Sequence, residues 1–320
     1  MERYRGERFR AVIEAGLNWG VIYDMLSEIE GIERGNVANA SQIKAISSAK
    51  IKADRIDSKI LEQLLRLDFI PEIYVPDKRR RVLKDIIRYR LFIVRLKTMV
   101  KNKIHDILLK SCVMMSEVKD IFGKYGMDFL ERLELPDRNA DSLLRHNLEL
   151  YKKLVEEEKE ISSYIEREVG ETEEVRLLRS IPGIGKVFGQ LIALEIKDVN
   201  RFPSVKHLCS YCGLVPSTHS SGNTSYHGKL IKGNKWLRWA FIEAVYTSIN
   251  VSPYFKKHYD KMAYRGGKSM GTISTARKLV AVVYHVLKEK RKYFEFYPNY
   301  KDRLPSDGDS RRSTPDSCQE

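Results

Sequence analysis

Cysteine and long apolar runs are scarce in this sequence, and each shortage excludes a class of protein. Four cysteines in 320 residues cannot build the dense disulfide framework of a small secreted domain. No stretch approaches the roughly 18 consecutive apolar residues that a membrane helix needs, and the first residues, MERYRGERFR, lack the apolar core of a signal peptide. We therefore expect a cytoplasmic protein with no membrane segment.

Positive charge, in contrast, is abundant. The chain has 57 Lys and Arg residues against 43 Asp and Glu, which gives a formal net charge of +14, and its pI is about 9.4. Hydrophobic residues make up 42% of the sequence, enough to bury a core. Because a positive field concentrates phosphates around any fold, the charge balance predicts DNA or RNA as the partner.

Hydrophobic periodicity divides the chain into four parts. Residues 1–75 predict a short α/β pattern. We expect a strand in ERFRAVIEAG and a helix in NWGVIYDMLSEIEGI. A strand or turn in NVANASQIKAI and a helix in KADRIDSKILEQLLRL follow. Residues 76–172 predict a helical arm, 173–295 a mainly helical globular domain, and 296–320 a polar, disordered tail.

The arm is expected to contain two long helices. Apolar residues recur at helical spacing from Lys78 to Lys110, and a glutamate-rich helix spans about Asp141 to Val169, so the two can pair as an antiparallel arm or a coiled coil. The first helix carries twelve Lys or Arg residues against two acids. A solvated helix face is the simpler reading of such a run. The surplus charge instead favours contact with a nucleic-acid backbone, and we choose Arg88, Arg95 and Lys101 to represent that surface.

The segment SIPGIGKVFGQLIAL, residues 180–194, predicts a tight turn between two helices. Gly183 and Gly185 would let the backbone approach a phosphate closely, and the following helix offers free amide groups. This arrangement resembles a helix-hairpin-helix, which binds DNA backbones without sequence preference. An ordinary Pro-Gly connection between helices is the alternative.

The segment STHSSGNTSYHG, residues 217–228, is rich in hydroxyl groups around Gly222. Such a composition is typical of a surface loop. It also offers a nucleophile, with Ser221 before the glycine and Ser220 as its close rival, while Lys229, Lys232 and Arg238 follow to bind phosphate oxygens.

Two cysteines lie three residues apart, and three histidines lie nearby in the sequence. Cys209 and Cys212 suggest zinc, but His219 and His227 are eight positions apart, too far for a second pair of zinc ligands. We expect the two cysteines to be small hydrophobic residues on a helix that ends at Gly213.

Three carboxylates in the first part suggest a metal site. Glu14 ends the apolar strand AVI, and Asp54 and Asp57 lie on one face of a helix. RNase H-like nucleases hold Mg²⁺ with acids in such an arrangement, because a hard divalent ion takes several oxygen ligands. The neighbouring cations Lys52, Arg55 and Lys59 also fit a solvated helix face.

The order of the motifs resembles one known family, the DEDD-type insertion-sequence transposases of the insertion sequence 110 type. The resemblance covers most of residues 10–250. The motifs are AVIEAGLNWGVIYDMLSE, KADRIDSKILEQLL, RRRVLKDIIRYRLFIVRLKTMVKNKIHDIL, SIPGIGKVFGQLIALEI, RFPSVKHLCSYCGLVP, HSSG and LIKGNKWLRWAFIEA.

The resemblance implies a RuvC-like, RNase H-like α/β domain, a coiled-coil arm and a mainly α transposase domain. It implies that Glu14, Asp54 and Asp57 bind Mg²⁺ or Mn²⁺ and that Ser221 is the catalytic serine. It also implies DNA recombination guided by a structured RNA, in a dimer or tetramer whose active sites combine the carboxylates of one subunit with the serine of another.

The family's fourth acid lies on an earlier strand, and no Asp precedes Asp24 here. We therefore expect a RuvC-like domain that lacks its first strands, either because the start lies upstream or because the copy has decayed. Two functions stay open: a transposase, or a catalytically inactive copy that only binds nucleic acid.

Overall fold

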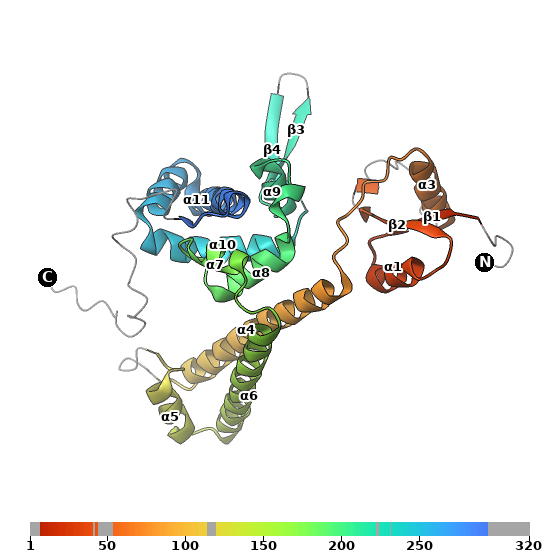
Figure 1. The fold of residues 1–320 in the computed structure, drawn as a ribbon. Coiled ribbons are helices and arrows are strands. Elements are labelled where there is room, and N and C mark those ends of the chain that lie inside the picture. Colours follow the sequence, from red (N-terminus) through yellow and green to blue (C-terminus); the bar gives the residue numbers. More distant parts are fainter. Residues whose placement is uncertain are drawn as a thin grey trace. The chain divides into compact units, whose positions relative to one another are not determined.

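The computed structural model describes residues 7–40, 42–43, 54–113, 120–221, 224–230 and 232–293. The chain divides into two units, Met1–Val82 and Leu83–Glu320. Helices dominate the described part of the chain, which also contains two small two-stranded sheets (Figure 1). The fold is thus mainly helical, with a small parallel sheet in the first unit. The four-part division of the sequence stays a prediction, and the expected disordered tail, 296–320, lies outside the described residues.

The first unit is built on two parallel strands, β1 (Phe9–Glu14) and β2 (Ile32–Ala38). Helix α1 (Trp19–Ser27) connects them, as parallel pairing requires a crossover. Both α1 and α3 (Asp54–Arg66) contact the strands. The expected first strand and both expected helices are therefore confirmed, whereas the larger RNase H-like sheet stays a prediction.

Three helices follow: α4 (Lys78–Lys110), α5 (Lys124–Arg132) and α6 (Arg138–Glu168). Their apolar faces share one buried cluster, which contains Ile104 of α4, Leu130 of α5 and Leu148 of α6. Arg90, early in α4, bonds to Glu158, late in α6, while Lys101 lies over the ring of Tyr151. The two long helices therefore run antiparallel; coiled-coil geometry stays a prediction. Sequence reasoning missed α5.

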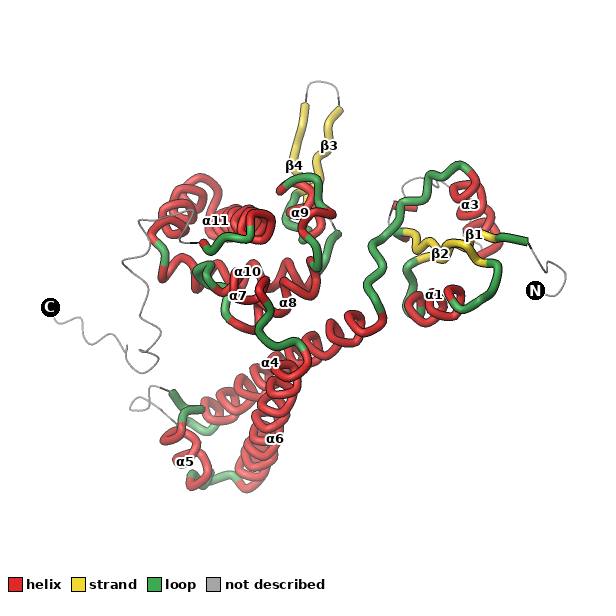
Figure 2. The backbone as a smooth tube through the Cα atoms, in the orientation of Figure 1, coloured by secondary structure: helices red, strands yellow, loops and turns green. Residues whose placement is uncertain are grey.

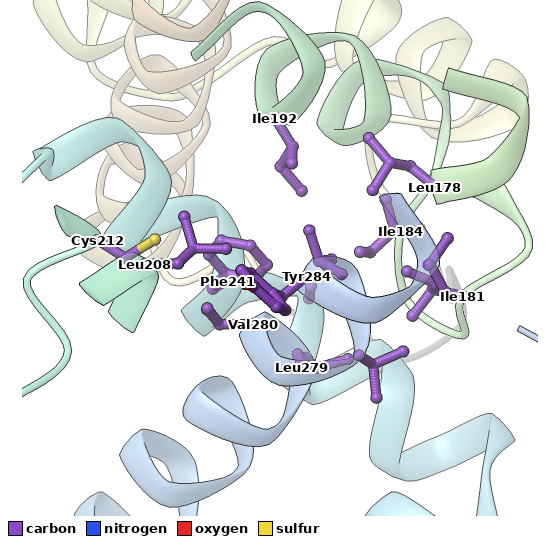
Figure 3. Close-up of a cluster of buried hydrophobic side chains, with 14 of the residues drawn as sticks. Leu178, Ile181, Ile184, Ile192, Leu208, Cys212, Phe241, Leu279, Val280 and Tyr284 are labelled. Atoms are coloured by element: carbon purple, nitrogen blue, oxygen red, sulfur yellow. The ribbon is translucent and has the colours of Figure 1, made fainter. Parts of the chain in front are cut away.

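The C-terminal part is a layered helical domain around one core. Its helices are α7 (Glu173–Arg179), α8 (Lys186–Ile196), the short 3₁₀ turn η2 (Val199–Arg201), α9 (Val205–Tyr211), α10 (Lys235–Val251) and α11 (Pro253–Glu289). Figure 3 shows side chains from several of these helices converging, among them Ile192, Phe241 and Tyr284. This burial stabilises the short helices α7, α8 and α9, which would be marginal in isolation.

Cys209 and Cys212 lie in this core, as the sequence predicts. Both side chains are buried, and burial raises the pKa of each thiol, most strongly that of Cys212. Both belong to the cluster of buried hydrophobic residues that forms this core, so they pack as small apolar side chains.

Helix α11 is a helical hairpin and not one straight rod. Gly266 (φ −153°) and Gly267 (φ +82°) interrupt it. The hydroxyl of Ser274 lies 3.0 Å from Nε2 of His258, and Lys278 Nζ lies 3.9 Å from the centre of the Tyr254 ring. Residues on either side of the glycines therefore face each other in reverse order, as in two antiparallel helices.

Candidate catalytic and nucleic-acid site

Ser221 is the last residue of a β-strand. β3 (Pro216–Ser221) pairs with β4 (Thr224–Leu230) in an antiparallel hairpin (Figure 2). In the register of this pair, Ser221 is opposite Thr224. The expectation of a surface loop is corrected here: the segment forms a hairpin whose strands lack the apolar alternation by which strands are recognised. The side chain of Ser221, like those of Ser220 and Lys229, lies outside the described residues.

The base of the hairpin is fixed by contacts between its two flanking segments. The backbone N–H of Asn234 donates to the backbone carbonyl oxygen of Tyr211 at 2.8 Å. Gly213 (φ +66°) and Gly233 touch, because a Cβ on Gly233 would fall 2.5 Å from the Gly213 Cα. Only glycine allows this approach. The hairpin therefore starts from a rigid stem.

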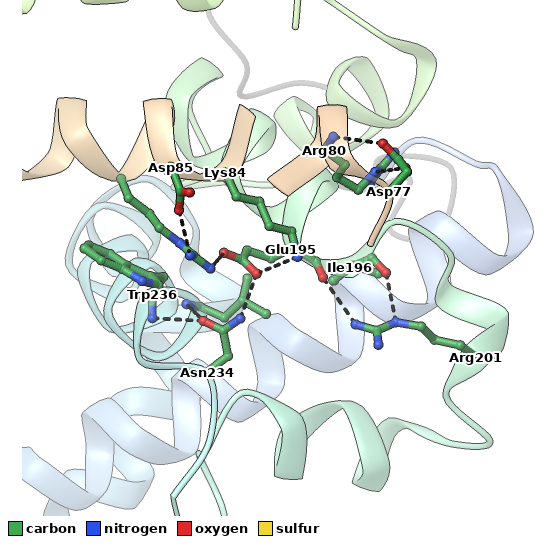
Figure 4. Close-up of polar contacts among 11 residues, drawn as sticks. Asp77, Arg80, Lys84, Asp85, Glu195, Ile196, Arg201, Asn234 and Trp236 are labelled. Carbon is green, nitrogen blue, oxygen red and sulfur yellow. Dashed lines mark hydrogen bonds and ion pairs between the residues drawn. The ribbon is translucent and has the colours of Figure 1, made fainter. Parts of the chain in front are cut away.

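A buried carboxylate joins this stem to the long helix α4 (Figure 4). Glu195 of α8 is 1% exposed and accepts from Arg88 Nη2 at 2.6 Å and from Asn234 Nδ2 at 2.9 Å; Lys84 Nζ lies 3.1 Å away. Asn234 in turn caps α10, because its Oδ1 accepts from the Trp236 and Leu237 amides. One carboxylate thus connects α4, α8 and the segment that follows β4.

The electrostatics of Glu195 follow from these partners. Burial by itself would raise the pKa of the carboxyl group, but the cations Lys84 and Arg88 outweigh burial and hold that pKa below its usual value. Glu195 is therefore a carboxylate at neutral pH. Sequence reasoning missed it, although an acid flanked by Leu194 and Ile196 in an apolar helix requires a buried cation as partner.

Part of the positive charge on α4 is balanced within the protein. Arg88 is bound to Glu195, and Glu158 of α6 accepts from both Arg90 and Lys97. Arg95 is exposed, and the described residues contain no ion-pair partner for it. Lys101 lies 4.5 Å from the centre of the Phe122 ring. Among the three cations chosen from the sequence, Arg95 is thus the most accessible to a phosphate.

The two glycines of the PGIG turn have different surroundings. A Cβ on Gly183 (φ +87°) would lie 2.2 Å from Ser248 Oγ and 2.4 Å from the Ala244 carbonyl oxygen. Gly183 therefore packs against α10. Gly185 precedes α8, and a Cβ there would meet nothing within 4 Å. Its backbone borders a cleft of about 950 Å³ between Phe188, Trp239 and the turn.

The other expected phosphate ligands lie around the hairpin stem. Lys232 is exposed two residues beyond β4. Arg238, in the first turn of α10, places its guanidinium so close to Gly213 that a Cβ there would fall 2.2 Å from Nη2. Arg238 therefore also fills space beside the stem. Binding of nucleic acid by either side chain stays a prediction.

The predicted metal ligands belong to the first unit. Glu14 is exposed at the end of β1, and its backbone is paired with Ala38. Asp57 is half-buried on α3, while the side chain of Asp54 lies outside the described residues. Arg10 Nη2 lies 2.6 Å from Asp68 Oδ1, so the C-terminal end of α3 lies beside the start of β1. The acids' roles stay predictions.

Comparison with known proteins gives this architecture a family context. Residues 175–260 match the IS116/IS110/IS902 transposase family. This segment runs from α7 into α11 and contains the PGIG turn, Glu195, the hairpin and Asn234. The chain is 38% identical over 121 residues to a pilin gene-inverting protein of Moraxella bovis, in an alignment covering 37% of this chain and 38% of the relative.

Two further relatives are insertion-sequence proteins. An insertion element IS110 protein of 43.6 kDa from Streptomyces coelicolor is 32% identical over 116 residues, which are 35% of this chain and 28% of the relative. The transposase for insertion sequence element IS1111A from Coxiella burnetii is 25% identical over 215 residues, 60% and 58% of the two chains. This chain thus spans less than two thirds of each relative's length.

No helix in the described ranges is long and apolar enough to cross a membrane.

Proposed function

We propose that this chain is an insertion-sequence transposase or recombinase that cleaves DNA strands and rejoins them. The match of residues 175–260 to a transposase family carries the proposal. The similarity to pilin gene-inverting proteins extends it to the inversion of DNA segments. The net charge of +14 supports a polyanionic substrate.

In this proposal Ser221 is the nucleophile. Its Oγ loses a proton and attacks a DNA phosphorus, the bond from phosphorus to a deoxyribose oxygen breaks, and that oxygen takes up a proton and leaves as a hydroxyl. A hydroxyl of the joining strand then attacks the phosphoserine and releases Ser221. The backbone pairing of Ser221 with Thr224 supports the role, because a nucleophile needs a fixed position.

Glu14, Asp54 and Asp57 are the proposed ligands of Mg²⁺ or Mn²⁺. Three carboxylates suit a hard divalent ion, which supplies positive charge for the phosphoryl transition state when bound. The first unit would adopt an RNase H-like arrangement, and α4 with α6 a coiled-coil arm. Glu14 is exposed to solvent, which is compatible with binding an ion.

We further propose that a structured guide RNA and a second copy of the chain take part. Apolar residues exposed along the arm, such as Phe92 of α4 and Leu150 of α6, supply a surface on which copies can associate. A dimer or tetramer would let the carboxylates of one subunit meet Ser221 of another. A strictly monomeric species, with and without nucleic acid, would contradict this part of the proposal.

A nucleic-acid-binding protein without cleavage activity is the second candidate. It rests on the surplus of positive charge, because a net charge of +14 serves the binding of nucleic acid whether or not a strand is cleaved. This candidate keeps the basic surface of α4 and the PGIG turn but needs neither Ser221 nor metal.

Trapping a covalent intermediate tests the proposal. The chain is incubated with Mg²⁺, DNA carrying the ends of the element and the RNA transcribed from the element, and denatured complexes are analysed by peptide mass spectrometry. We expect a DNA end linked to Ser221, loss of the adduct in Ser221→Ala and its retention in Ser220→Ala. An adduct on Ser220 would show that Ser220, and not Ser221, is the nucleophile. DNA binding with no metal-dependent cleavage would favour the second candidate.

A further inference from the structure

The turn of the α11 hairpin presents an exposed cluster of side chains. Gly266 and Gly267 form the turn, and Lys261, Tyr264, Arg265 and Lys268 surround it; we call these four side chains the α11 tip. All four are exposed, and Tyr264 is 95% exposed. A tyrosine exposed among three exposed cations offers both a hydroxyl group and an aromatic ring to a ligand.

The hairpin holds the α11 tip rigidly. A Cβ on Gly271 would lie 3.0 Å from the Ala263 Cβ and 3.1 Å from the Tyr259 ring, so glycine lets the two halves approach closely. Farther from the turn, the His258–Ser274 and Lys278–Tyr254 contacts hold the halves together. The tip is therefore a narrow projection on a braced support.

The charge of the α11 tip is uncompensated. Between Asp260 and Glu289 the sequence contains no acidic residue and six Lys or Arg residues. Across the described part of the chain, no carboxylate forms an ion pair with Lys261, Arg265 or Lys268. The cations of α4 differ, because several of them are bound to Glu158 or Glu195. The tip is thus prepared to bind an anion without first breaking an internal ion pair.

We propose that the α11 tip binds the backbone of duplex DNA, independently of sequence, as a second contact beside the α4 surface. The inference rests on the proposed function in DNA recombination. Lys261, Arg265 and Lys268 would neutralise phosphates, and the Tyr264 hydroxyl would donate to a phosphate oxygen. A projecting tip fits the groove of a duplex, whereas single strands are usually bound in a basic groove with several stacking platforms.

Matched charge reversals test this inference. The tip variant combines Arg265→Glu with Lys268→Glu. The control combines Arg176→Glu with Lys206→Glu, which reverses two exposed cations on α7 and α9 and changes the net charge by the same amount. Affinity of the full chain for duplex DNA of unrelated sequences is measured by fluorescence anisotropy across a salt series. We expect the tip variant to bind at least about tenfold more weakly, with a salt slope smaller by about 2, and the control to lose little.

A neutral substitution separates local contact from overall charge. Tyr264→Ala should weaken duplex binding a few-fold without changing the salt slope, because no charge is removed. Equal weakening by the tip and control reversals, together with wild-type binding by Tyr264→Ala, would overturn the inference. A larger effect on single-stranded DNA or on RNA than on duplex would overturn it as well. If the wild-type chain itself binds no DNA, the proposed function fails and not merely the role of the tip.

Discussion

Arg88 of α4 and Glu195 of α8 form an ion pair of 2.6 Å in which the carboxylate is 1% exposed and the arginine side chain 30% exposed. A charge on that carboxylate is tolerated because Lys84 and Asn234 also bind it. The pair joins the most basic helix of the chain to the domain that bears the hairpin. Substitution of either residue is therefore expected to lower stability, and to change DNA binding only as a consequence.

Replacing Glu195 should destabilise the C-terminal unit strongly. In Glu195→Gln the side chain keeps its size, but Lys84, itself 8% exposed, loses the charge that balances it. Removing one partner of a buried pair costs about 3–5 kcal/mol. Urea unfolding followed by circular dichroism measures the loss, with Asp85→Asn as the control, because Asp85 is 74% exposed and also pairs with Arg88. Equal stability of the two variants would contradict this role.

The same carboxylate makes stability dependent on pH. Since the pKa of Glu195 is lowered in the folded protein, its contribution is fully present above the unfolded pKa of about 4.3 and is lost as pH falls through the folded value. The difference in unfolding free energy between wild type and Glu195→Gln should therefore shrink below about pH 4. A difference that stays constant from pH 7 to pH 3 would show that charge is not the cause.

Arg95 and Arg88 should respond differently to charge reversal. Arg95→Glu places an acid on an exposed face, so we expect an unchanged fold, weaker binding of DNA and RNA of any sequence, and a salt slope smaller by about 1 or more. Arg88→Glu instead sets two carboxylates together at Glu195 and should lower the melting temperature. Binding measured against salt, together with thermal unfolding of both variants, distinguishes the two roles. Full binding by a folded Arg95→Glu variant would remove Arg95 from the interface.

Regular helical periodicity made much of the fold predictable. The expected helix from Lys78 to Lys110 matches α4, and the second long helix begins at Arg138, three residues before the expected Asp141. Periodicity gave no signal for β3 and β4, because their side chains are mostly hydroxyl-bearing or basic and do not alternate with apolar residues. The hairpin is closed at its base by the contact of Gly213 with Gly233, which periodicity does not reveal either.

Sequence reasoning named candidate residues by their type, but it could not name the residues that contact them in the fold. Sequence reasoning singled out Arg88 for its charge, yet only the fold shows that Glu195, 107 positions away, binds it. It also treated Gly183 and Gly185 alike, because both are glycines in one turn. Local sequence contains no information on which of them faces α10, since that depends on how two helices pack.

The two glycines provide the last prediction. Gly183→Ala would require φ near +87° for a residue with a Cβ and would drive that Cβ into Ser248 and the Ala244 carbonyl, so we expect a loss of about 2 kcal/mol or more. Gly185→Ala keeps an ordinary φ of −78° and enters open space, so stability should change by no more than about 1 kcal/mol.

For DNA binding we expect the opposite pattern: Gly185→Ala should weaken binding directly, and Gly183→Ala should act only through stability. At a temperature where both variants are folded, Gly185→Ala should weaken binding, because its Cβ would keep a phosphate from the amide groups at the start of α8. Gly183→Ala should bind normally once folded, since its backbone faces α10. Anisotropy titrations at matched folded fractions provide the measurement. Wild-type affinity in a stable Gly185→Ala variant would mean that the turn serves only to pack α8 against α10, and that phosphate contacts lie on the α4 surface and the α11 tip instead.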